Sequence, residues 1–272
     1  MDAESLFAVL AALQRQGRRY VLATVVETSG SAPQKPGAKL ALTADGALLG
    51  TIGGGAIENQ VVEAARAMLD APGAPASRML QTHLTRDLGM CCGGRMSVFL
   101  ERFEPRAALW LFGAGHVNRA VAQAAAAVGF RVTVVDERED WLTAERFGPC
   151  ERLLEDPAVA ARRVAFDPND LVAVATHDHP LDEQVLVALA GKPLAYLGCI
   201  GSARKAIRFR ERLTQRGLAA ADLDRIQMPM GVDIGAQTAE EIAVSVVAEL
   251  IRVRAARAHR AQRPRAVASN PG

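Results

Sequence analysis

The chain has 272 residues, half of them hydrophobic and 23% charged, with a formal net charge of +2. This composition is typical of a globular protein of about two domains, which can bury a core without disulfides or a structural metal. The small net charge, the acidic start and the lack of any apolar run of about 20 residues give no indication of nucleic-acid binding, a signal peptide or a membrane span. The four cysteines form no zinc-type CxxC pair, and free thiols suit a reducing compartment, so we expect a cytoplasmic protein.

The first part of the chain, residues 1–104, is predicted to form a small α+β domain. An amphipathic helical pattern begins it, and Val- and Thr-rich strand patterns follow. The Asp45-Gly46 step between two strand-like runs is a strong hairpin signal. The expected elements are helix 4–16, strands 20–27, 38–43 and 47–52, helix 57–69 and strand 96–102.

The second part, residues 105–256, alternates strands with helices, which predicts a Rossmann-type α/β domain with a parallel sheet. Gly129 is expected to end its first helix, and Thr238 with Glu241 forms a capping-box pattern at the start of its last helix. Residues 257–272 are basic and are expected to form a disordered tail. The expected strands are 107–112, 131–135, 171–176 and 194–199, with helices ending at 128, beginning at 181, spanning 202–216 and following 238.

A glycine-rich turn lies where the first strand of the second domain gives way to a helix. Gly113 and Gly115 let the backbone approach a pyrophosphate, which would sit on the helix N-terminus near His116. Asp136 ends the next strand, where an acidic side chain can hold a ribose hydroxyl. Asn118 departs from the dinucleotide fingerprint, which has Gly or Ala there. The pattern predicts a phosphate-bearing ligand, and a Rossmann fold with an altered pocket is the alternative.

A second glycine-rich turn, Gly53-Gly54-Gly55, lies in the first domain between a strand and a helix. Three glycines allow a nest of backbone N–H groups that binds an anion, and Glu58 stands one helical turn later. A tight strand-to-helix connection explains the same spacing equally well. Both interpretations stay open at this point.

The segment Cys91-Cys92-Gly93-Gly94 precedes a strand. Small neighbours would leave a thiolate of Cys92 accessible as a nucleophile, a sulfur carrier or a soft metal ligand next to Gly93. A buried pair of small apolar side chains is the competing interpretation. Cys199 is expected to be a core residue.

Two further strand ends and one loop carry polar residues. The carboxyl ends of parallel strands are where doubly wound sheets bind ligands, so these residues are candidates for polar or phosphate contacts rather than for a metal site. The candidates are Thr176, His177, Gly201, Arg204, Lys205 and Asp233.

These motifs occur in a fixed order from about Leu6 to Val253. They are Gly30-Ser31-Ala32-Pro33, Ile52-Gly53-Gly54-Gly55 with Glu58, Cys92-Gly93-Gly94, Gly113-Ala114-Gly115-His116-Val117, Leu197-Gly198 with Ile200-Gly201-Ser202, and Gly231 to Thr238. The ordered set closely resembles the XdhC/CoxI family and is far more specific than any single motif.

The resemblance implies a chaperone for the molybdenum cofactor (molybdopterin) without turnover of its own. Such a protein would protect the cofactor while a cysteine desulfurase installs its terminal sulfur ligand. It would then help to insert the cofactor into the molybdenum subunit of xanthine dehydrogenase. The resemblance also implies a homodimer, with Cys92 as the family's cysteine in contact with molybdenum or sulfur. Many relatives have a second cysteine where this chain has Ala56.

Two other functions stay open. An NAD(P)-dependent oxidoreductase would explain the Rossmann pattern but not the glycine and cysteine motifs of the first domain, and Tyr20 and Tyr196 lack the context of a catalytic Tyr–Lys pair. A nucleotidyl transferase acting on the cofactor would need an acidic Mg²⁺-binding cluster, which the sequence does not show. We also expect the loops Gly53–Gly55 and Gly113–His116 to face one cleft between the domains.

Overall fold

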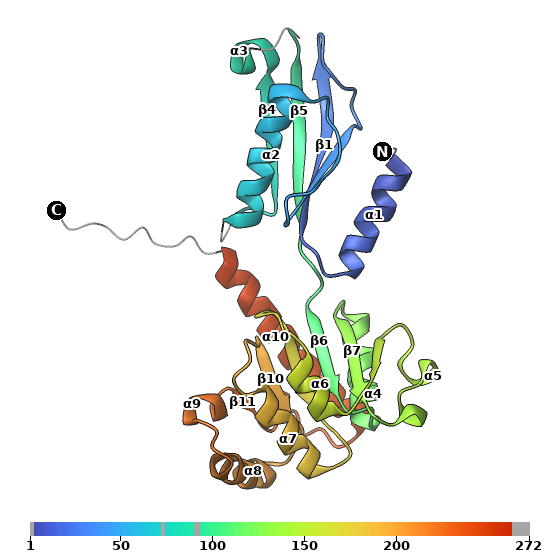
Figure 1. Cartoon of the computed structure of the whole chain (residues 1–272), viewed down its shortest axis with the longest axis vertical. Helices are drawn as coiled ribbons and strands as arrows, with labels where there is room; N and C mark the ends of the chain where they lie inside the picture. The colour runs from blue at the N-terminus through green and yellow to red at the C-terminus, as the bar shows by residue number, and fades with distance from the viewer. Residues whose placement is uncertain (1–2, 72–73, 90–92, 263–272) are drawn as a thin grey trace, which may run out of the picture. The chain divides into compact units, whose positions relative to one another are not determined.

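The computed structural model describes residues 3–71, 74–89 and 93–262 of the chain (Figure 1). Its internal contacts divide the chain into two compact units, with the division between Pro105 and Arg106. The residues up to Pro105 form the N-terminal unit, and Arg106–Arg257 form the C-terminal unit.

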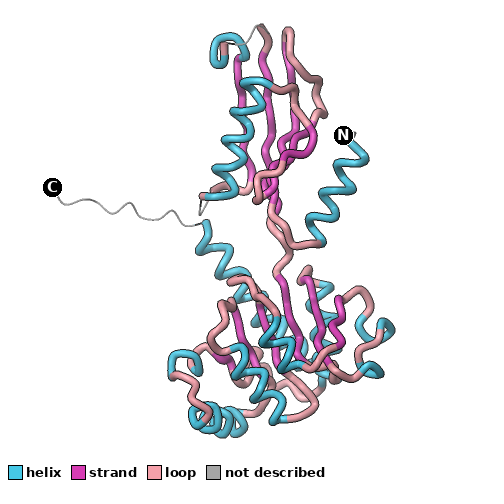
Figure 2. The backbone as a smooth tube through the Cα atoms, in the orientation of Figure 1, coloured by secondary structure: helices cyan, strands magenta, loops and turns pink. Residues whose placement is uncertain are grey.

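The N-terminal unit is an antiparallel sheet with a helix packed on each face (Figure 2). Its elements are α1 (Ala3–Arg15), β1 (Tyr20–Ser29), β2 (Lys39–Thr43), β3 (Leu48–Gly50), α2 (Gly55–Asp70), β4 (Ser77–His83), α3 (Leu84–Leu88) and β5 (Arg95–Phe103). The five strands follow the order β3-β2-β1-β5-β4. Val21 and Ala23 of β1 pack toward α2, whereas Tyr20 and Leu22 pack toward α1, as the alternation of a strand requires.

The two ends of β1 differ in character. The apolar cluster around α1 contains Tyr20 and Leu22 from the beginning of the strand. The pairing of β1 with β5 shifts register between Val25 and Glu27, and beyond this irregularity Glu27 and Ser29 are exposed. The end of β1 therefore contributes polar side chains to the surface of the sheet rather than to the core.

The C-terminal unit is a parallel sheet with helices on both faces, which confirms the predicted Rossmann-type fold. Its elements are β6 (Ala108–Phe112), α4 (His116–Ala127), β7 (Arg131–Asp136), the 3₁₀ helix η1 (Glu139–Trp141), α5 (Ala144–Phe147), β8 (Glu151–Leu154), α6 (Pro157–Arg163), β9 (Leu171–Val174), α7 (His179–Leu189), β10 (Tyr196–Cys199), α8 (Ala203–Gln215), α9 (Ala220–Leu223), β11 (Ile226–Gln227) and α10 (Ala239–Gln262). The six strands follow the order β11-β10-β9-β6-β7-β8. Strand order reverses between β6 and β9, so the ligand-binding crevice of such sheets is expected at the carboxyl ends of these two strands.

Each face of this sheet has its own apolar core. Helices α4 and α10 cover one face, with Val121 and Val246 among the residues packed against Leu109 and Leu111 of β6. Helices α6, α7 and α8 cover the other face, where Val172 and Val174 of β9 are fully buried. Because the central strands are buried on both faces, their sequences are almost continuously apolar.

Most of the predicted helices and strands are confirmed, and the elements that were not predicted are short or polar. Strands β2 and β3 pair as the predicted hairpin, and Thr238 and Glu241 form the predicted capping box with two reciprocal hydrogen bonds of 3.1 Å. The elements not predicted are short or largely polar segments without a clear periodicity, namely β4, α3, η1, α5, β8, α6, α9 and β11. Helix α10 continues to Gln262, so the prediction of a disordered tail from residue 257 is wrong for residues 257–262, and residues 263–272 lie outside the described residues.

Asn118 explains how α4 is attached to the sheet without the small residue of the dinucleotide fingerprint. The side chain is fully buried, and its Nδ2 donates hydrogen bonds to the carbonyl oxygens of Phe112, at 3.0 Å, and Gly113, at 2.8 Å. Phe112 O also accepts a hydrogen bond from Ala175 N, whereas Gly113 O depends on Asn118. The amide therefore fixes the glycine turn from behind.

We expect Asn118→Ala to lower the free energy of unfolding of the C-terminal unit by about 1–3 kcal/mol, because the buried carbonyl of Gly113 loses its partner. Chemical denaturation measures this change. Gln123→Ala, on the exposed face of the same helix, is the matched control and should stay within about 0.5 kcal/mol of the wild type. Equal denaturation midpoints for the two variants would contradict the role assigned to Asn118.

Candidate functional site

The predicted site residues of the C-terminal unit lie at one edge of its sheet. Gly113, Asp136, Thr176 and Gly201 follow or end β6, β7, β9 and β10, which are consecutive in the sheet. Because the strands are parallel, their carboxyl ends meet at the same edge. The residues that were grouped as ligand-binding candidates from the sequence therefore lie at the same edge of the sheet.

The turn at Gly113 crosses the next strand end at very short range. Gly113 has a φ of +104°, and a Cβ placed on it would lie 2.2 Å from the carbonyl oxygen of Ala175 and 2.7 Å from the Cα of Thr176. No other residue type fits this close approach in this backbone conformation. The glycine turn and the Thr176–His177 segment thus form the two sides of the switch point between β6 and β9.

Asp136, the predicted ribose-binding residue, already has four hydrogen bonds within the protein. Its Oδ2 accepts from Ala114 N at 2.6 Å and from a guanidinium nitrogen of Arg138 at 2.8 Å, and its Oδ1 accepts from the backbone N and the Nε of Arg138. Burial alone would raise the pKa of this carboxyl, but the bonds from Arg138 and Ala114 outweigh burial and lower the pKa. The carboxylate therefore stabilises the glycine turn in its charged form.

A basic and aromatic cluster surrounds this carboxylate. The guanidinium groups of Arg138 and Arg146 each lie 4.8 Å from the ring centre of Trp141, and the His116 ring meets Trp141 edge-on at 5.5 Å. Arg146 also donates to the carbonyl oxygens of Ala114 and Trp141, at 3.1 and 3.0 Å. The cluster thus occupies the space beside the glycine turn with the protein's own side chains.

Thr176, after β9, and Lys205, in the first turn of α8, share a buried carboxylate. Asp182 of α7 accepts hydrogen bonds from the backbone N and the Oγ1 of Thr176, and Lys205 Nζ donates to its second oxygen at 3.1 Å. Lys205 also donates to the carbonyl oxygen of Ile200 at 3.2 Å. This lysine is therefore engaged in holding two strand-end loops together.

The other sequence candidates at these loops are more open to solvent. His177, Arg204 and Asp233 are exposed, and Asp233 accepts a long hydrogen bond, of 3.4 Å, from Gly235 N. Gly201 lies in the loop that precedes α8 and is half-buried. These residues surround the switch point without forming a cluster of their own.

The glycine turn of the N-terminal unit encloses an internal anion. Glu58 Oε2 accepts hydrogen bonds from Thr51 Oγ1 at 2.6 Å, from Ile52 N at 3.1 Å and from Gly54 N at 3.2 Å. Burial opposes ionisation of Glu58, but these three bonds together lower its pKa. Two backbone N–H groups of this turn thus converge on the chain's own carboxylate, whereas Gly53 N donates to Thr51 Oγ1 at 3.1 Å. Binding of an external anion by the three glycines stays a prediction.

Three sequence motifs of the N-terminal unit converge at one end of its sheet. A Cβ on Gly53 would lie 2.7 Å from Pro33 Cβ, so the turns at 30–33 and 53–55 are in direct contact. Gly94 N donates to Ser31 O at 3.1 Å, and Gly94 O accepts from Leu84 N at 2.9 Å. Motifs that are far apart in the sequence therefore meet beside the start of β5.

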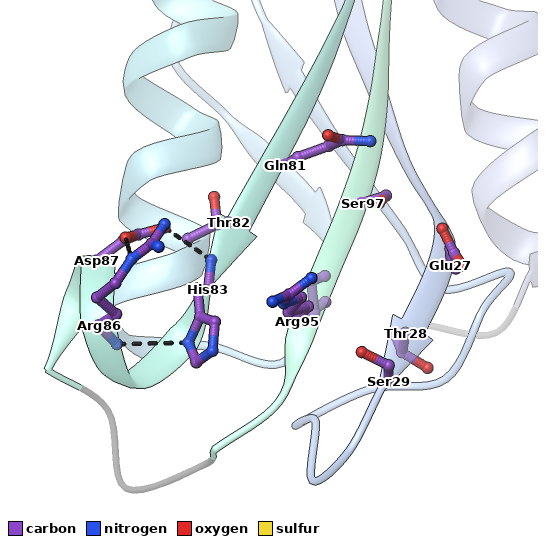
Figure 3. A pocket seen from close by; sticks show the side chains of 11 residues that line it. Glu27, Thr28, Ser29, Gln81, Thr82, His83, Arg86, Asp87, Arg95 and Ser97 are labelled. Atoms are coloured by element: carbon purple, nitrogen blue, oxygen red, sulfur yellow. Dashed lines mark hydrogen bonds and ion pairs between the residues drawn. The ribbon is translucent and has the colours of Figure 1, made fainter.

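A polar groove of about 470 Å³ opens at the same end of the sheet (Figure 3). It is lined by the end of β1, the end of β4, helix α3 and the beginning of β5. Side chains of both charge signs face it, including Glu27, His83, Asp87 and Arg95. Its volume lies in the range of small-molecule sites, about 300–1,000 Å³.

The cysteines divide into two groups. Cys150 and Cys199 are buried, and burial raises the pKa of Cys199 to about 12, so its thiol stays protonated and the predicted core role is confirmed. The proposed cofactor cysteine, Cys92, and its neighbour Cys91 lie outside the described residues, whereas Gly93 is described and exposed. In the part of the chain that the structure describes, no group of three or more His, Cys, Asp or Glu side chains could hold a metal ion.

The sequence analysis missed the partners that fix these turns. Arg138, Trp141 and Asp182 carry the contacts around the switch point, and His83 and Arg95 face the groove. The position of Arg138, two residues after Asp136, was a usable signal. The groove residues carried no such signal in the sequence, because β4 was not predicted and its pairing with β5 could therefore not be inferred.

Comparison with known proteins gives consistent matches along the chain. YqeB of Escherichia coli, an uncharacterized protein, is 37% identical over 92% of this chain and 46% of its own length. A protein of Bacillus subtilis described as a probable subunit of xanthine dehydrogenase is 37% identical over 58% of this chain and 46% of its own length. The molybdenum cofactor insertion chaperone PaoD of Escherichia coli is 27% identical over 91% of this chain and 87% of its own length. The chain spans about half the length of the first two relatives.

A solved structure shares the fold. A crystal structure of a xanthine dehydrogenase from Bacillus halodurans matches 93% of this chain and 96% of its own chain, with a TM-score of 0.52 and 23% identity. None of the described helices combines the length and apolar character needed to cross a membrane. Because residues 109–250 match the XdhC Rossmann domain and residues 13–81 match the XdhC and CoxI family, the chain belongs to the XdhC and CoxI family.

Proposed function

We propose that this protein is a chaperone that binds the molybdenum cofactor and delivers it to an enzyme of the xanthine dehydrogenase type. Family membership and the similarity to PaoD, a molybdenum cofactor insertion chaperone, support this proposal. The finer steps are part of the same proposal. The protein protects the cofactor during sulfuration by a cysteine desulfurase, works as a homodimer in the cytoplasm, and meets the molybdenum subunit of its target during insertion.

The observation that favours a chaperone over an NAD(P)-dependent oxidoreductase is the bonding of Asp136. In a dinucleotide site this carboxylate accepts hydrogen bonds from the ribose hydroxyls. A carboxylate offers about four lone-pair positions, and Ala114 and Arg138 already supply four hydrogen bonds. Arg138 and Trp141 also occupy the space beside the glycine turn, so an adenosine group would have to displace them.

We expect NAD(H) and NADP(H) to show no saturable binding to the wild-type protein in the micromolar range, measured by titration calorimetry and by nicotinamide fluorescence. Arg138→Ala frees one face of the Asp136 carboxylate and should raise the affinity for NAD(H) above that of the wild type. Arg163→Ala, which removes an exposed ion pair with Glu155 in the same unit, is the matched control and should change nothing. Micromolar binding by the wild type with hydride transfer to a substrate would establish the oxidoreductase instead.

The polar groups of the N-terminal unit suit the chemical groups of the molybdenum cofactor. The molybdenum cofactor combines a phosphate, a polar pterin and a dithiolene-bound metal, and the groove offers polar groups of both charge signs next to the Gly93-Gly94 step. We propose that the thiolate of Cys92, the residue preceding this step, contacts the molybdenum or its sulfur, since soft thiolates bind such centres.

We expect the purified protein, loaded with molybdenum cofactor and passed through gel filtration, to retain molybdenum and pterin in near-equimolar amounts. Cys92→Ala should retain less of both, because it removes the proposed soft ligand. Cys150→Ala, which changes a buried core thiol, is the control for general effects of cysteine removal on a folded chain. Full retention and full target activation by Cys92→Ala would remove the role proposed for this thiol.

A further inference from the structure

The groove residues form ordered rows across three strands. His83 of β4 pairs with Arg95 of β5, and Arg95 pairs on its other side with Ser29 of β1. Neighbouring strands are about 4.8 Å apart, so the three side chains form one continuous row. Figure 3 shows Arg95 between His83 and Ser29 on the sheet surface.

A second row of different character lies beside the first. Gln81 of β4 pairs with Ser97 of β5, and Ser97 pairs with Glu27 of β1. Residues two apart in a strand lie about 7 Å from each other on the same face. The intervening Thr82 points the other way, where its Oγ1 donates to Gln60 of α2 at 2.8 Å. The groove thus has a basic row and, next to it, a row rich in hydrogen-bond acceptors.

The charged side chains at the centre of these rows are not paired with opposite charges of the described residues. Within the described part of the chain, Arg95 and Glu27 have no ion-pair partner, whereas the nearby Arg86 is held by Asp87 at 2.8 Å. The Nδ1 of His83 accepts a hydrogen bond from Arg86 N, which leaves Nε2 as the protonated donor of the neutral ring. An anion at Arg95 could therefore receive hydrogen bonds from the guanidinium, the imidazole and the Ser29 hydroxyl.

The glycine turns offer an anion less than their sequences indicate. Glu58 already accepts from Ile52 N and Gly54 N, and Asp136 accepts from Ala114 N. A phosphate at either turn would approach a carboxylate of the same charge. At the basic row the exposed Asp87 accepts hydrogen bonds from His83 N and Arg86, but among the described residues no carboxylate is paired with Arg95 itself. Arg95 is therefore the more favourable phosphate site.

We propose that this groove binds the cofactor from both ends, with Arg95, His83 and Ser29 on its phosphate and Glu27 with Gln81 on the N–H groups of its pterin. A carboxylate suits the amino-pyrimidinone edge of a pterin because that edge presents adjacent N–H donors, and a guanidinium suits a phosphate because it presents a fork of donors. The inference rests on the proposed function and assigns the recognition of the cargo to the N-terminal sheet.

The test compares the binding of intact and dephosphorylated cofactor by the wild type and by groove variants of the full chain. The amount of pterin bound per chain is measured by fluorescence. Arg95→Ala should weaken retention of the intact cofactor about tenfold or more, as loss of a charged hydrogen bond does. Arg95→Lys should restore part of it. Phosphatase-treated cofactor should bind the wild type as weakly as Arg95→Ala binds the intact cofactor, and Arg95→Ala should no longer distinguish the two forms. Glu27→Gln should weaken both forms equally.

The controls lie in the same unit and leave the groove intact. Arg78→Ala, on β4, and Glu63→Gln, on α2, remove exposed charges outside the groove and should bind like the wild type. If the wild type retains the cofactor and Arg95→Ala still loses affinity on dephosphorylation, the phosphate lies elsewhere and the inference is overturned while the proposed function stands. If the wild type retains no cofactor, the proposed function itself fails.

Discussion

Carboxylates that accept hydrogen bonds from backbone N–H groups hold the loops of this protein in place. Glu58 fixes the turn at Gly54, Asp136 fixes the turn at Ala114, and Asp182 fixes Thr176. Glu249 of α10 does the same for Gly231, whose N donates to it at 2.7 Å, and the carboxylate also accepts from Tyr196. Each loop therefore has a defined backbone before any ligand arrives. At Asp136, Asp182 and Glu249 this means that a buried charge must stay bonded.

This internal bonding changes what the glycine motifs mean. A glycine turn in front of a helix usually exposes N–H groups to an external phosphate. Here the chain supplies the anion itself at both turns, and Arg138, Trp141 and Arg146 close the space next to Asp136. The Rossmann fold is retained, but its usual adenosine contacts are occupied. We infer that recognition of an anionic cargo depends on side chains such as Arg95, and that the rigid turns shape the surfaces around it.

The elements that could be predicted are those whose signals are local. Continuous apolar runs gave the buried strands around Leu111 and Val174, and the Asp45-Gly46 step gave the hairpin. The site was predicted only in part, since glycines report a backbone requirement but not what meets it. That Asn118 would donate to Gly113 O, or that Glu58 would reach back to Gly54, depends on side-chain reach in three dimensions. The groove was missed because β4 is a polar edge strand whose residues acquire their meaning only through pairing with β5.

The central claim is that the protein delivers the molybdenum cofactor to a target enzyme. The most direct measurement mixes the cofactor-loaded protein with cofactor-free xanthine dehydrogenase in air, where free cofactor decays, and follows the recovery of enzyme activity and the transfer of molybdenum between the two proteins. We expect faster and more complete recovery than an equal amount of free cofactor gives, with molybdenum leaving this protein as activity appears. Recovery no better than with free cofactor, although the protein holds the cofactor tightly, would contradict a chaperone role.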